Sequence, residues 1–202
     1  MLHSSLLSRL DWVTHGFGTR LDAISQDEMA CLRQIHSDTV LAADRTGRVG
    51  DGDALITGLR RVTVSVRTAD CYPILLADAR NRAVAAVHAG WRGTAARIVQ
   101  HALEAMRAKF GTAPADVRAA IGPGIGVCCY EVGAEVAAQF GLTGAGHIDL
   151  AAANRSQLLA AGVPGEGIEI VGACTRCDPA QFHSFRRDKE RAGRMVSYIG
   201  VR

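Results

Sequence analysis

The stretch SVRTADCYPILLADARNRAVAAVHAGWRG (65–93) decides the fold, because it holds two short apolar runs close together. The runs YPILLAD (72–78) and AVAAVHA (83–89) are apolar almost throughout, which is typical of strands buried on both faces. The four residues between them indicate a tight connection. Just upstream, RVTVSVRT (61–68) alternates β-branched and polar residues, as a half-buried strand does. Consecutive strands over 61–89 predict antiparallel pairing.

Helical periodicity is clearest over residues 94–110, where apolar residues recur on one face and Gly111 follows as a natural stop. Two further segments, 131–140 and 149–161, are also predicted to be helical, the second with Asp149 at its start. The remaining predicted strands are 116–122, 167–172 and 194–201. This mixture predicts an α/β or α+β fold, a single domain over residues 1–202 with a mixed β sandwich and flanking helices.

Composition excludes several classes of protein. Of the 202 residues, 48% are hydrophobic, which supplies a substantial core and excludes a disordered chain. No apolar run approaches the ~20 residues of a membrane helix, and the first residues lack the pattern of a signal peptide. We therefore expect a cytoplasmic protein without a membrane partner. The formal net charge is +3 with scattered basic residues, which argues against a nucleic-acid partner.

Cys71 and His88 each lie at an end of a predicted buried strand, so neighbouring strand ends can bring them together. Such a pair suits a thiol nucleophile with its base, or two metal ligands. His36, in RQIHSDTV, extends the set to two imidazoles and one thiolate, which suits zinc with an open fourth position. The spacings of 35 and 17 residues match no zinc finger. From spacing and composition alone, an ordinary role in the core or at the surface is favoured for each such His or Cys.

The other cysteines are interpreted as reduced thiols. CTRC (174–177) has the Cys-x-x-Cys spacing, but no second such pair accompanies it to complete a four-cysteine zinc site. Cys128 and Cys129 are adjacent, and an extended chain would point them to opposite sides. They belong to the glycine-rich GPGIGVCCYEVG (122–133), which can present backbone amides to an anion but is not a Walker loop.

Basic residues cluster in FHSFRRDKERAGRM (182–195), just before the last predicted strand. One interpretation is a solvated turn. The alternative is capture of phosphate or another anion by charge-assisted bidentate bonds. The cluster consists of Arg186, Arg187, Lys189, Arg191 and Arg194.

Several segments together resemble a known family. They are, in this order, QIHSDTV, DGDALIT, TADCYPILLAD, AAVHAGWRG, AIGPGIGVCCYEVG, HIDL and FHSFRRDKERAGRM, and the whole resemblance covers roughly residues 14–200. They are similar to the laccase-domain family, also called the multicopper polyphenol oxidase-like or peptidoglycan-editing-factor family. The resemblance implies a purine nucleoside phosphorylase and adenosine deaminase with a mixed sandwich fold. It implies a purine nucleoside and phosphate as partners of a monomer or small homo-oligomer.

The resemblance also implies site residues. The metal ligands would be His36, Cys71 and His88, with zinc as the usual metal and copper as a possible one. Carboxylates to move protons would be Asp53 and Asp70. A strand would point Asp70 away from Cys71, which favours either Asp53 or a turn at the strand end. Substrate contacts would be Arg20, Gln34, Arg92, Arg186 and Arg187.

Three alternatives stay open. Cys71 and His88 can form a thiol hydrolase or amidase linked to peptidoglycan editing, since the family resembles toxin deamidases with a Cys-His pair. Older family naming implies a copper-dependent polyphenol oxidase, but one His₂Cys site cannot alone reduce oxygen by four electrons. A binding module without catalysis is the third. One departure from the family is that Arg20 and Gln34 are only 14 positions apart, so a segment that contributes substrate contacts is mostly missing.

Overall fold

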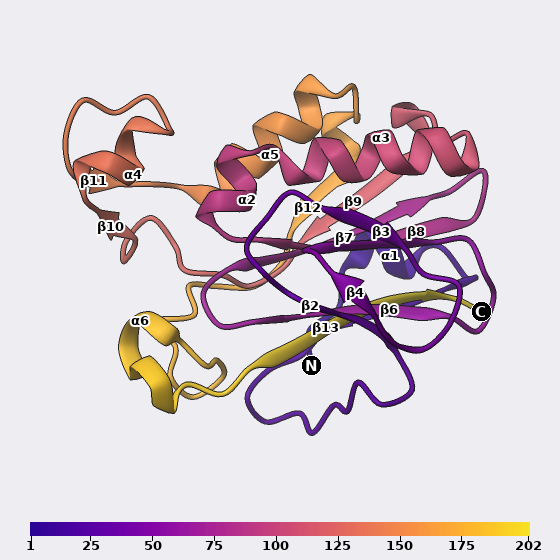
Figure 1. Cartoon of the computed structure of the whole chain (residues 1–202), viewed down its shortest axis with the longest axis horizontal. Coiled ribbons are helices and arrows are strands. Elements are labelled where there is room, and N and C mark those ends of the chain that lie inside the picture. The colour runs from indigo at the N-terminus through magenta and orange to yellow at the C-terminus, as the bar shows by residue number, and fades with distance from the viewer.

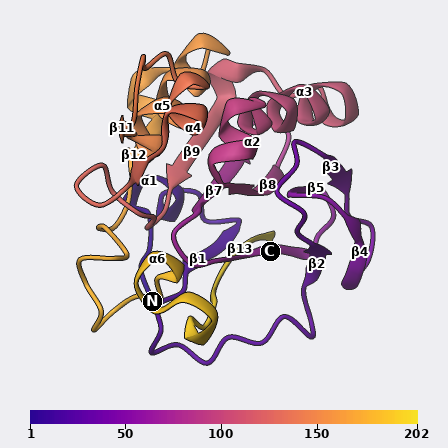
Figure 2. The ribbon, with the colours of Figure 1, turned by 60° about the vertical axis from the view of Figure 1, so that its left-hand side comes forward.

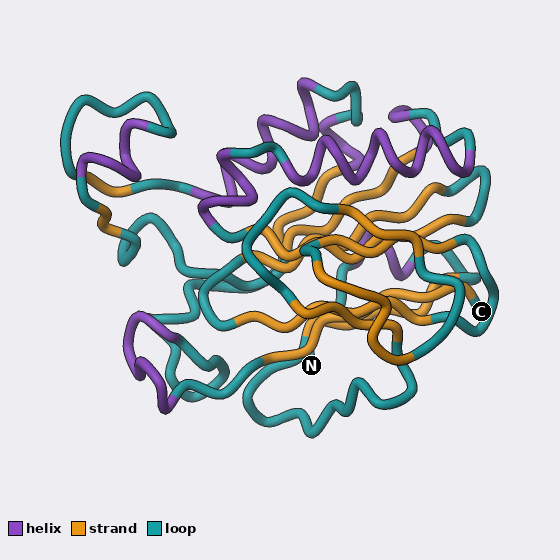
Figure 3. The backbone as a smooth tube through the Cα atoms, viewed as in Figure 1, coloured by secondary structure: helices purple, strands orange, loops and turns teal.

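The computed structural model describes all residues 1–202 as two stacked β-sheets with helices on one outer face (Figures 1 and 3). The strand order in the six-stranded sheet is β12 (Ile168–Ile170), β9 (Val117–Ile121), β7 (Tyr72–Asp78), β8 (Ala83–Ala89), β5 (Ala54–Thr57) and β3 (Val40–Ala42). In the five-stranded sheet it is β1 (Val13–Phe17), β13 (Met195–Val201), β6 (Thr63–Thr68), β2 (Ala30–Arg33) and β4 (Gly47–Asp51). The predicted mixed α+β sandwich with flanking helices is confirmed.

The hairpin of β7 and β8 lies at the centre of the six-stranded sheet. The strands pair antiparallel, with Tyr72 opposite Ala89 and Pro73 opposite His88. Every residue of both strands is buried, as the two apolar runs predict. The prediction that β6 continues this antiparallel series was wrong. β6 belongs to the five-stranded sheet, where it pairs with β13 and β2, and the chain crosses to the six-stranded sheet only after Thr68.

Alternate residues of the central strands serve two separate cores. On β7, Ile74 and Leu76 pack toward the helices, in a cluster of 26 buried residues. Leu75 and Ala77 pack toward the five-stranded sheet, in a cluster of 18. The period of two along a strand explains this division, and it makes the hairpin the shared middle layer of the molecule.

Three helices cover the six-stranded sheet (Figure 1), namely α2 (Trp91–Ala95), α3 (Ile98–Phe110) and α5 (Leu150–Ala160). The single predicted helix over 94–110 is two helices, because Arg97 adopts a left-handed conformation with φ 62° and interrupts the ladder. Gly111 ends α3 with φ 72°, as predicted. Asp149 caps α5 by accepting a hydrogen bond from the Ala152 N–H.

Shorter elements extend the two ends of the sheets. The predicted helix over 131–140 is only α4 (Ala134–Ala138), which projects from the sandwich with a two-stranded ribbon of β10 (Glu131–Val132) and β11 (Gly146–His147) (Figures 1 and 2). Below it lies α6 (Phe185–Asp188), followed by the 3₁₀ turn η3 (Lys189–Arg191). The other short elements are α1 (Ser5–Ser8), η1 (Pro114–Asp116) and η2 (Gly165–Gly167). None of the helices has the length and apolarity needed to cross a membrane.

Candidate metal centre and cavity

Three potential ligands from distant parts of the chain converge at one end of the β7–β8 hairpin. His36 lies in the loop after β2, Cys71 immediately precedes β7, and His88 is the penultimate residue of β8. Their ligand atoms all lie within 4.8 Å of one another. The imidazole rings of His36 and His88 meet edge to face, with centroids 4.9 Å apart. This group of one thiol and two imidazoles can bind a metal ion.

The backbone at this point is unusual in two ways. His36 and Asp70 both adopt positive φ angles, 60° and 86°, a region that few residues other than glycine occupy. Gly90 has an ordinary extended conformation, but a Cβ at this position would lie 2.9 Å from the Cys71 Sγ and 3.4 Å from the His36 Cδ2. The glycine of the HAGWRG motif therefore leaves room for two of the potential ligands.

Asp53 is buried next to this group and forms hydrogen bonds that position His36 and His88. Its carboxylate has no solvent exposure and lies 2.8 Å from the His88 Nδ1. It also accepts hydrogen bonds from the backbone N–H of His36, at 3.0 Å, and from the N–H and hydroxyl of Ser37. Burial alone would raise the pKa of Asp53, but the hydrogen bonds from His88 and Ser37 outweigh it and lower that pKa to about 2. An ionised carboxylate only accepts, so Nδ1 carries the proton and Nε2 stays available.

Cys71 has the electrostatic surroundings of a thiolate. Burial would raise the pKa of its thiol, but His36 and His88 together outweigh burial and lower the pKa to about 6. Burial would lower the pKa of His88, whereas Asp53 and Cys71 raise it to about 9. The two shifts have opposite directions, so the surroundings favour a negative charge on Cys71 and a positive charge beside it. A cation bound between them would take the place of the His88 proton.

The group opens into a cavity of about 570 Å³, a volume typical of small-molecule sites. Six basic side chains and one acidic side chain, Asp70, line it. The basic residues are Arg33, Arg48, Arg67, Arg186, Lys189 and Arg194. Aromatic rings of Trp91, Tyr130 and Phe185 complete the wall, and Phe185 is 42% exposed. The cavity therefore combines strong positive potential with surfaces on which a planar ring can stack.

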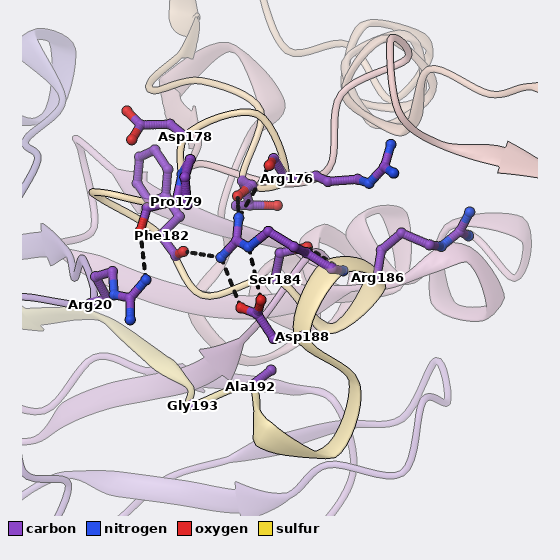
Figure 4. Close-up of polar contacts among 12 residues, drawn as sticks. Arg20, Arg176, Asp178, Pro179, Phe182, Ser184, Arg186, Asp188, Ala192 and Gly193 are labelled. Carbon is purple, nitrogen blue, oxygen red and sulfur yellow. Dashed lines mark hydrogen bonds and ion pairs between the residues drawn. The ribbon is translucent and has the colours of Figure 1, made fainter.

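The structure separates the four arginines suggested as substrate contacts. Arg186 lines the cavity, with its guanidinium 5.2 Å from the Tyr130 ring centre and a hydrogen bond to the Glu131 carbonyl. Arg20 instead donates to the Pro179 carbonyl, and Figure 4 shows Arg20 and Arg186 on opposite sides of the 176–188 segment. Arg20 is not among the residues that line the cavity.

Arg187 and Arg92 also lie outside the lining of the cavity. The Arg187 guanidinium donates to the backbone carbonyls of Thr175, Arg176 and Phe182 and pairs with Asp188, so it holds the segment together. Arg92 lies over the ring of its neighbour Trp91, at 4.5 Å.

Gln34 and Asp70 both line the cavity and both brace its walls. The Gln34 side chain forms two 2.8 Å hydrogen bonds with the backbone of Arg67, one to its N–H and one to its carbonyl. Asp70 accepts hydrogen bonds from the Thr175 hydroxyl and the Arg186 N–H, each at 2.6 Å. Asp70 lies in a positive-φ turn before β7 and lines the cavity, which agrees with the alternative of a turn at the strand end.

Sequence reasoning did not identify the basic residues Arg33, Arg48 and Arg67 of this cavity. Arg33 and Arg67 lie at the carboxyl ends of β2 and β6, and Arg48 lies on β4 beside β2. Each stands in an unremarkable strand in the sequence. The signal in the sequence is that an arginine stands a few residues before two of the candidate ligands, Arg33 before His36 and Arg67 before Cys71.

The chain belongs to the family described as multi-copper polyphenol oxidoreductase laccase, whose model matches residues 17–202. A protein of Deinococcus radiodurans named purine nucleoside phosphorylase is 43% identical over 185 residues, covering 87% of this chain and 71% of that protein. A protein of an unknown prokaryotic organism named adenosine deaminase RL5 is 40% identical over 200 residues, covering 87% and 76%.

Solved structures have the same fold. The crystal structure of YlmD from Geobacillus stearothermophilus has a TM-score of 0.83 at 34% identity, covering 89% of this chain and 76% of that one. The crystal structure of the hypothetical protein YfiH from Bacillus licheniformis has a TM-score of 0.88 at 27% identity, covering 95% and 94%. The resemblance found in the sequence motifs is thereby confirmed.

Proposed function

We propose that the chain is a zinc-dependent purine nucleoside enzyme, which performs phosphorolysis of nucleosides such as adenosine, inosine and methylthioadenosine and deamination of adenosine. The single observation that carries the proposal is the convergence of His36, Cys71 and His88 at a cationic, aromatic-lined cavity. The names of the two similar proteins, purine nucleoside phosphorylase and adenosine deaminase, support the substrate class.

The donor set fits zinc. Thiolate and imidazole are ligands that zinc prefers, and three protein ligands leave one position for water or substrate. The Asp53–His88 hydrogen bond supplies the carboxylate partner that metal-bound histidines commonly have, and it frees Nε2 for the metal. Copper also binds such a site tightly, so the metal identity is tested by metal analysis rather than by affinity alone. Zinc held here would supply a Lewis acid and lower the pKa of a bound water toward neutrality.

Phosphorolysis requires an anion site beside the sugar. A phosphate oxygen forms a bond to C1′ of the ribose while the bond from C1′ to the purine nitrogen breaks, and the leaving base takes up a proton. Arg186, Lys189 and Arg194 would hold the phosphate from one wall of the cavity, and Arg48 and Arg67 from the other. The rings of Phe185 and Tyr130 would stack on the base.

The two carboxylates have distinct proposed roles. Asp53 is buried behind His88, so it would orient that ligand and keep its proton on Nδ1. Asp70 faces the cavity and would fix the Arg186 backbone or exchange a proton with the substrate. Gln34 would keep the ends of β2 and β6 together through its paired bonds to Arg67.

A second candidate function has one specific observation in its favour. Cys71, His88 and Asp53 have the order of a thiol triad, with a thiol, a base and a carboxylate that orients the base. Such an enzyme would be a hydrolase or amidase. A thiol triad needs only one imidazole. Here a second imidazole, that of His36, also lies close to the Cys71 sulfur, which supports the metal centre instead.

Product analysis tests the proposal. Adenosine, inosine and methylthioadenosine are incubated with phosphate and zinc-loaded protein, with and without a chelator, and the products are separated by chromatography. We expect free purine bases that require phosphate, inosine from adenosine, and loss of both activities in chelator. Absence of any product from zinc-loaded protein contradicts the proposal. A metal-free protein that is rapidly alkylated at Cys71 and hydrolyses amides would favour the thiol triad.

We also infer that residues 1–202 form one domain. The two hydrophobic cores lie on opposite faces of the same six-stranded sheet, so neither core is complete without it. A single cooperative unfolding transition in both calorimetry and circular dichroism is expected.

A further inference from the structure

Four of the six cysteines form a second cluster, although their spacing in the sequence favoured separate reduced thiols. Cys128 and Cys129 come from the turn after β9, and Cys174 and Cys177 come from the CTRC turn after β12. All four sulfur atoms lie within 4.8 Å of one another. The adjacent cysteines share one side because the chain turns there, with the Cys129 and Tyr130 N–H groups both bonded to the Gly126 carbonyl. The expectation of an extended chain with opposed side chains was therefore wrong.

The spacing of the sulfurs matches a tetrahedral metal site. With metal–sulfur bonds of about 2.3 Å, the sulfur–sulfur edges of a tetrahedron are about 3.8 Å. The Sγ atoms of Cys128 and Cys129 are 3.8 Å apart, those of Cys128 and Cys177 are 3.6 Å apart, and those of Cys129 and Cys177 are 3.3 Å apart. All four are free thiols. Cys128 and Cys177 are exposed, whereas Cys129 and Cys174 are half-buried.

The backbone around the cluster is shaped for it. The Gly126 N–H donates to the Cys174 Sγ at 3.2 Å, a contact that supports a thiolate. A Cβ at Gly126 would lie 3.2 Å from the Cys174 Cβ and 3.4 Å from the Cys128 Sγ, so glycine allows the two turns to approach. A parallel bridge between Gly124 and Cys174 joins the same turns, with the Thr175 N–H donating to the Gly124 carbonyl at 3.0 Å.

We propose that Cys128, Cys129, Cys174 and Cys177 bind one zinc ion in a closed, structural Cys₄ site. The chemistry is that of a fully sulfur-ligated structural zinc, without an open position for substrate. The site would fasten the turn that carries Ile125 and Tyr130 to the segment that carries Thr175 and Arg186. Ile125, Tyr130 and Arg186 line the cavity, and Thr175 supports Asp70 by a hydrogen bond. The proposal rests on the cysteines alone and is independent of the proposed function.

Metal analysis of the full-length chain tests this inference. After purification without chelator, zinc is measured by elemental analysis and native mass spectrometry in the wild type, Cys71→Ser, Cys174→Ser/Cys177→Ser and Cys31→Ser. We expect two zinc ions per chain in the wild type and in the Cys31→Ser control, whose cysteine lies on β2. Cys71→Ser and the double variant should each lose one. A double variant with the full zinc content of the wild type would overturn the proposal.

Cys71→Ser keeps the proposal falsifiable if the double variant does not fold, because it retains all four cysteines. Its X-ray absorption spectrum should show a shell of sulfur alone at about 2.3 Å from zinc. A shell containing nitrogen or oxygen would overturn the proposal. So would a Cys71→Ser chain that binds no zinc after incubation with zinc chloride, or one whose mass shows these cysteines joined as disulfides.

Discussion

The Asp53 carboxylate lies 2.8 Å from the Nδ1 of His88, at a point where both side chains are almost completely buried. Asp53 is also bonded to the backbone of His36 and Ser37, so one carboxylate positions two of the three potential ligands.

Replacing Asp53 by Asn should weaken zinc binding at the His36–Cys71–His88 centre by about 10- to 100-fold, because an outer carboxylate keeps the histidine in the correct tautomer. Competition with a chromophoric chelator measures the affinity. Asp44→Asn is the control, since Asp44 is exposed and pairs only with its neighbour Arg45. Equal affinity for zinc in both variants would mean that Asp53 has no role in the centre.

Gly90→Ala should reduce the zinc content of this centre while the chain still folds, because the new methyl group would lie 2.9 Å from the Cys71 Sγ. Gly133→Ala is a matched control. Both glycines precede a short helix as its N-cap with negative φ, but nothing lies within 4 Å of a Cβ at Gly133. Zinc analysis and circular dichroism should separate the two variants, and normal zinc content in Gly90→Ala would refute this steric argument.

Arg186 and Arg187 are adjacent, but their substitutions should have different effects, one on phosphate binding and the other on stability. Arg186→Gln should raise the KM for phosphate with little change in the melting temperature, because its side chain lines the cavity. Arg187→Gln should lower stability by about 1–3 kcal/mol, because three backbone carbonyls lose a charged donor. Phosphate titrations and thermal melts test the pair. Identical effects on both measurements would contradict the assignment.

Asp78 should make stability depend on pH. Its buried carboxylate accepts hydrogen bonds, each of 2.9 Å, from the Arg80 N–H and from the backbone and side chain of Asn81. Burial would raise the pKa of Asp78, but the neighbouring Thr112 hydroxyl and the hydrogen bonds from Asn81 and Arg80 outweigh it and leave the pKa below its ordinary value of 3.8. A depressed folded pKa stabilises the protein above pH 3.8, and this stabilisation is lost as the pH falls through the folded pKa.

Asp78→Asn should therefore unfold at lower denaturant concentration near pH 7, with the difference from the wild type shrinking below pH 4. Denaturant titrations between pH 3 and pH 7 measure this, with the exposed Asp27→Asn as the control. A difference that grows as the pH falls would have the wrong sign for the proposed hydrogen bonds.

The sequence predicted the central hairpin because both of its strands are buried on both faces and therefore read as continuous apolar runs. It also grouped Cys71 with His88, since the ends of antiparallel neighbours must meet. The pairing partner of β6 could not be predicted from the sequence, because a half-buried strand can pair with several neighbours. Its actual partner, β13, lies more than a hundred residues away.

The second cysteine cluster shows a different limit. Cys174 lies far from Cys128 in the sequence, and only the parallel pairing of β9 with β12 places the turns that follow these strands side by side. The spacing rules for zinc sites assume pairs of the Cys-x-x-Cys kind, whereas here one half is an adjacent pair. The basic residues Arg33, Arg48 and Arg67 of the cavity could not be predicted for the same reason. They come together only through the packing of the three strands β2, β4 and β6.

The phosphate-dependent release of purine base from inosine by zinc-loaded protein tests the central claim most directly, in the wild type, Cys71→Ser and Cys31→Ser. The account predicts turnover by the wild type and Cys31→Ser, loss of it in chelator with recovery on adding zinc, and at least a 100-fold lower rate in Cys71→Ser, about 2.7 kcal/mol in the barrier. Turnover by Cys71→Ser at the wild-type rate, or none by the zinc-loaded wild type, would contradict it.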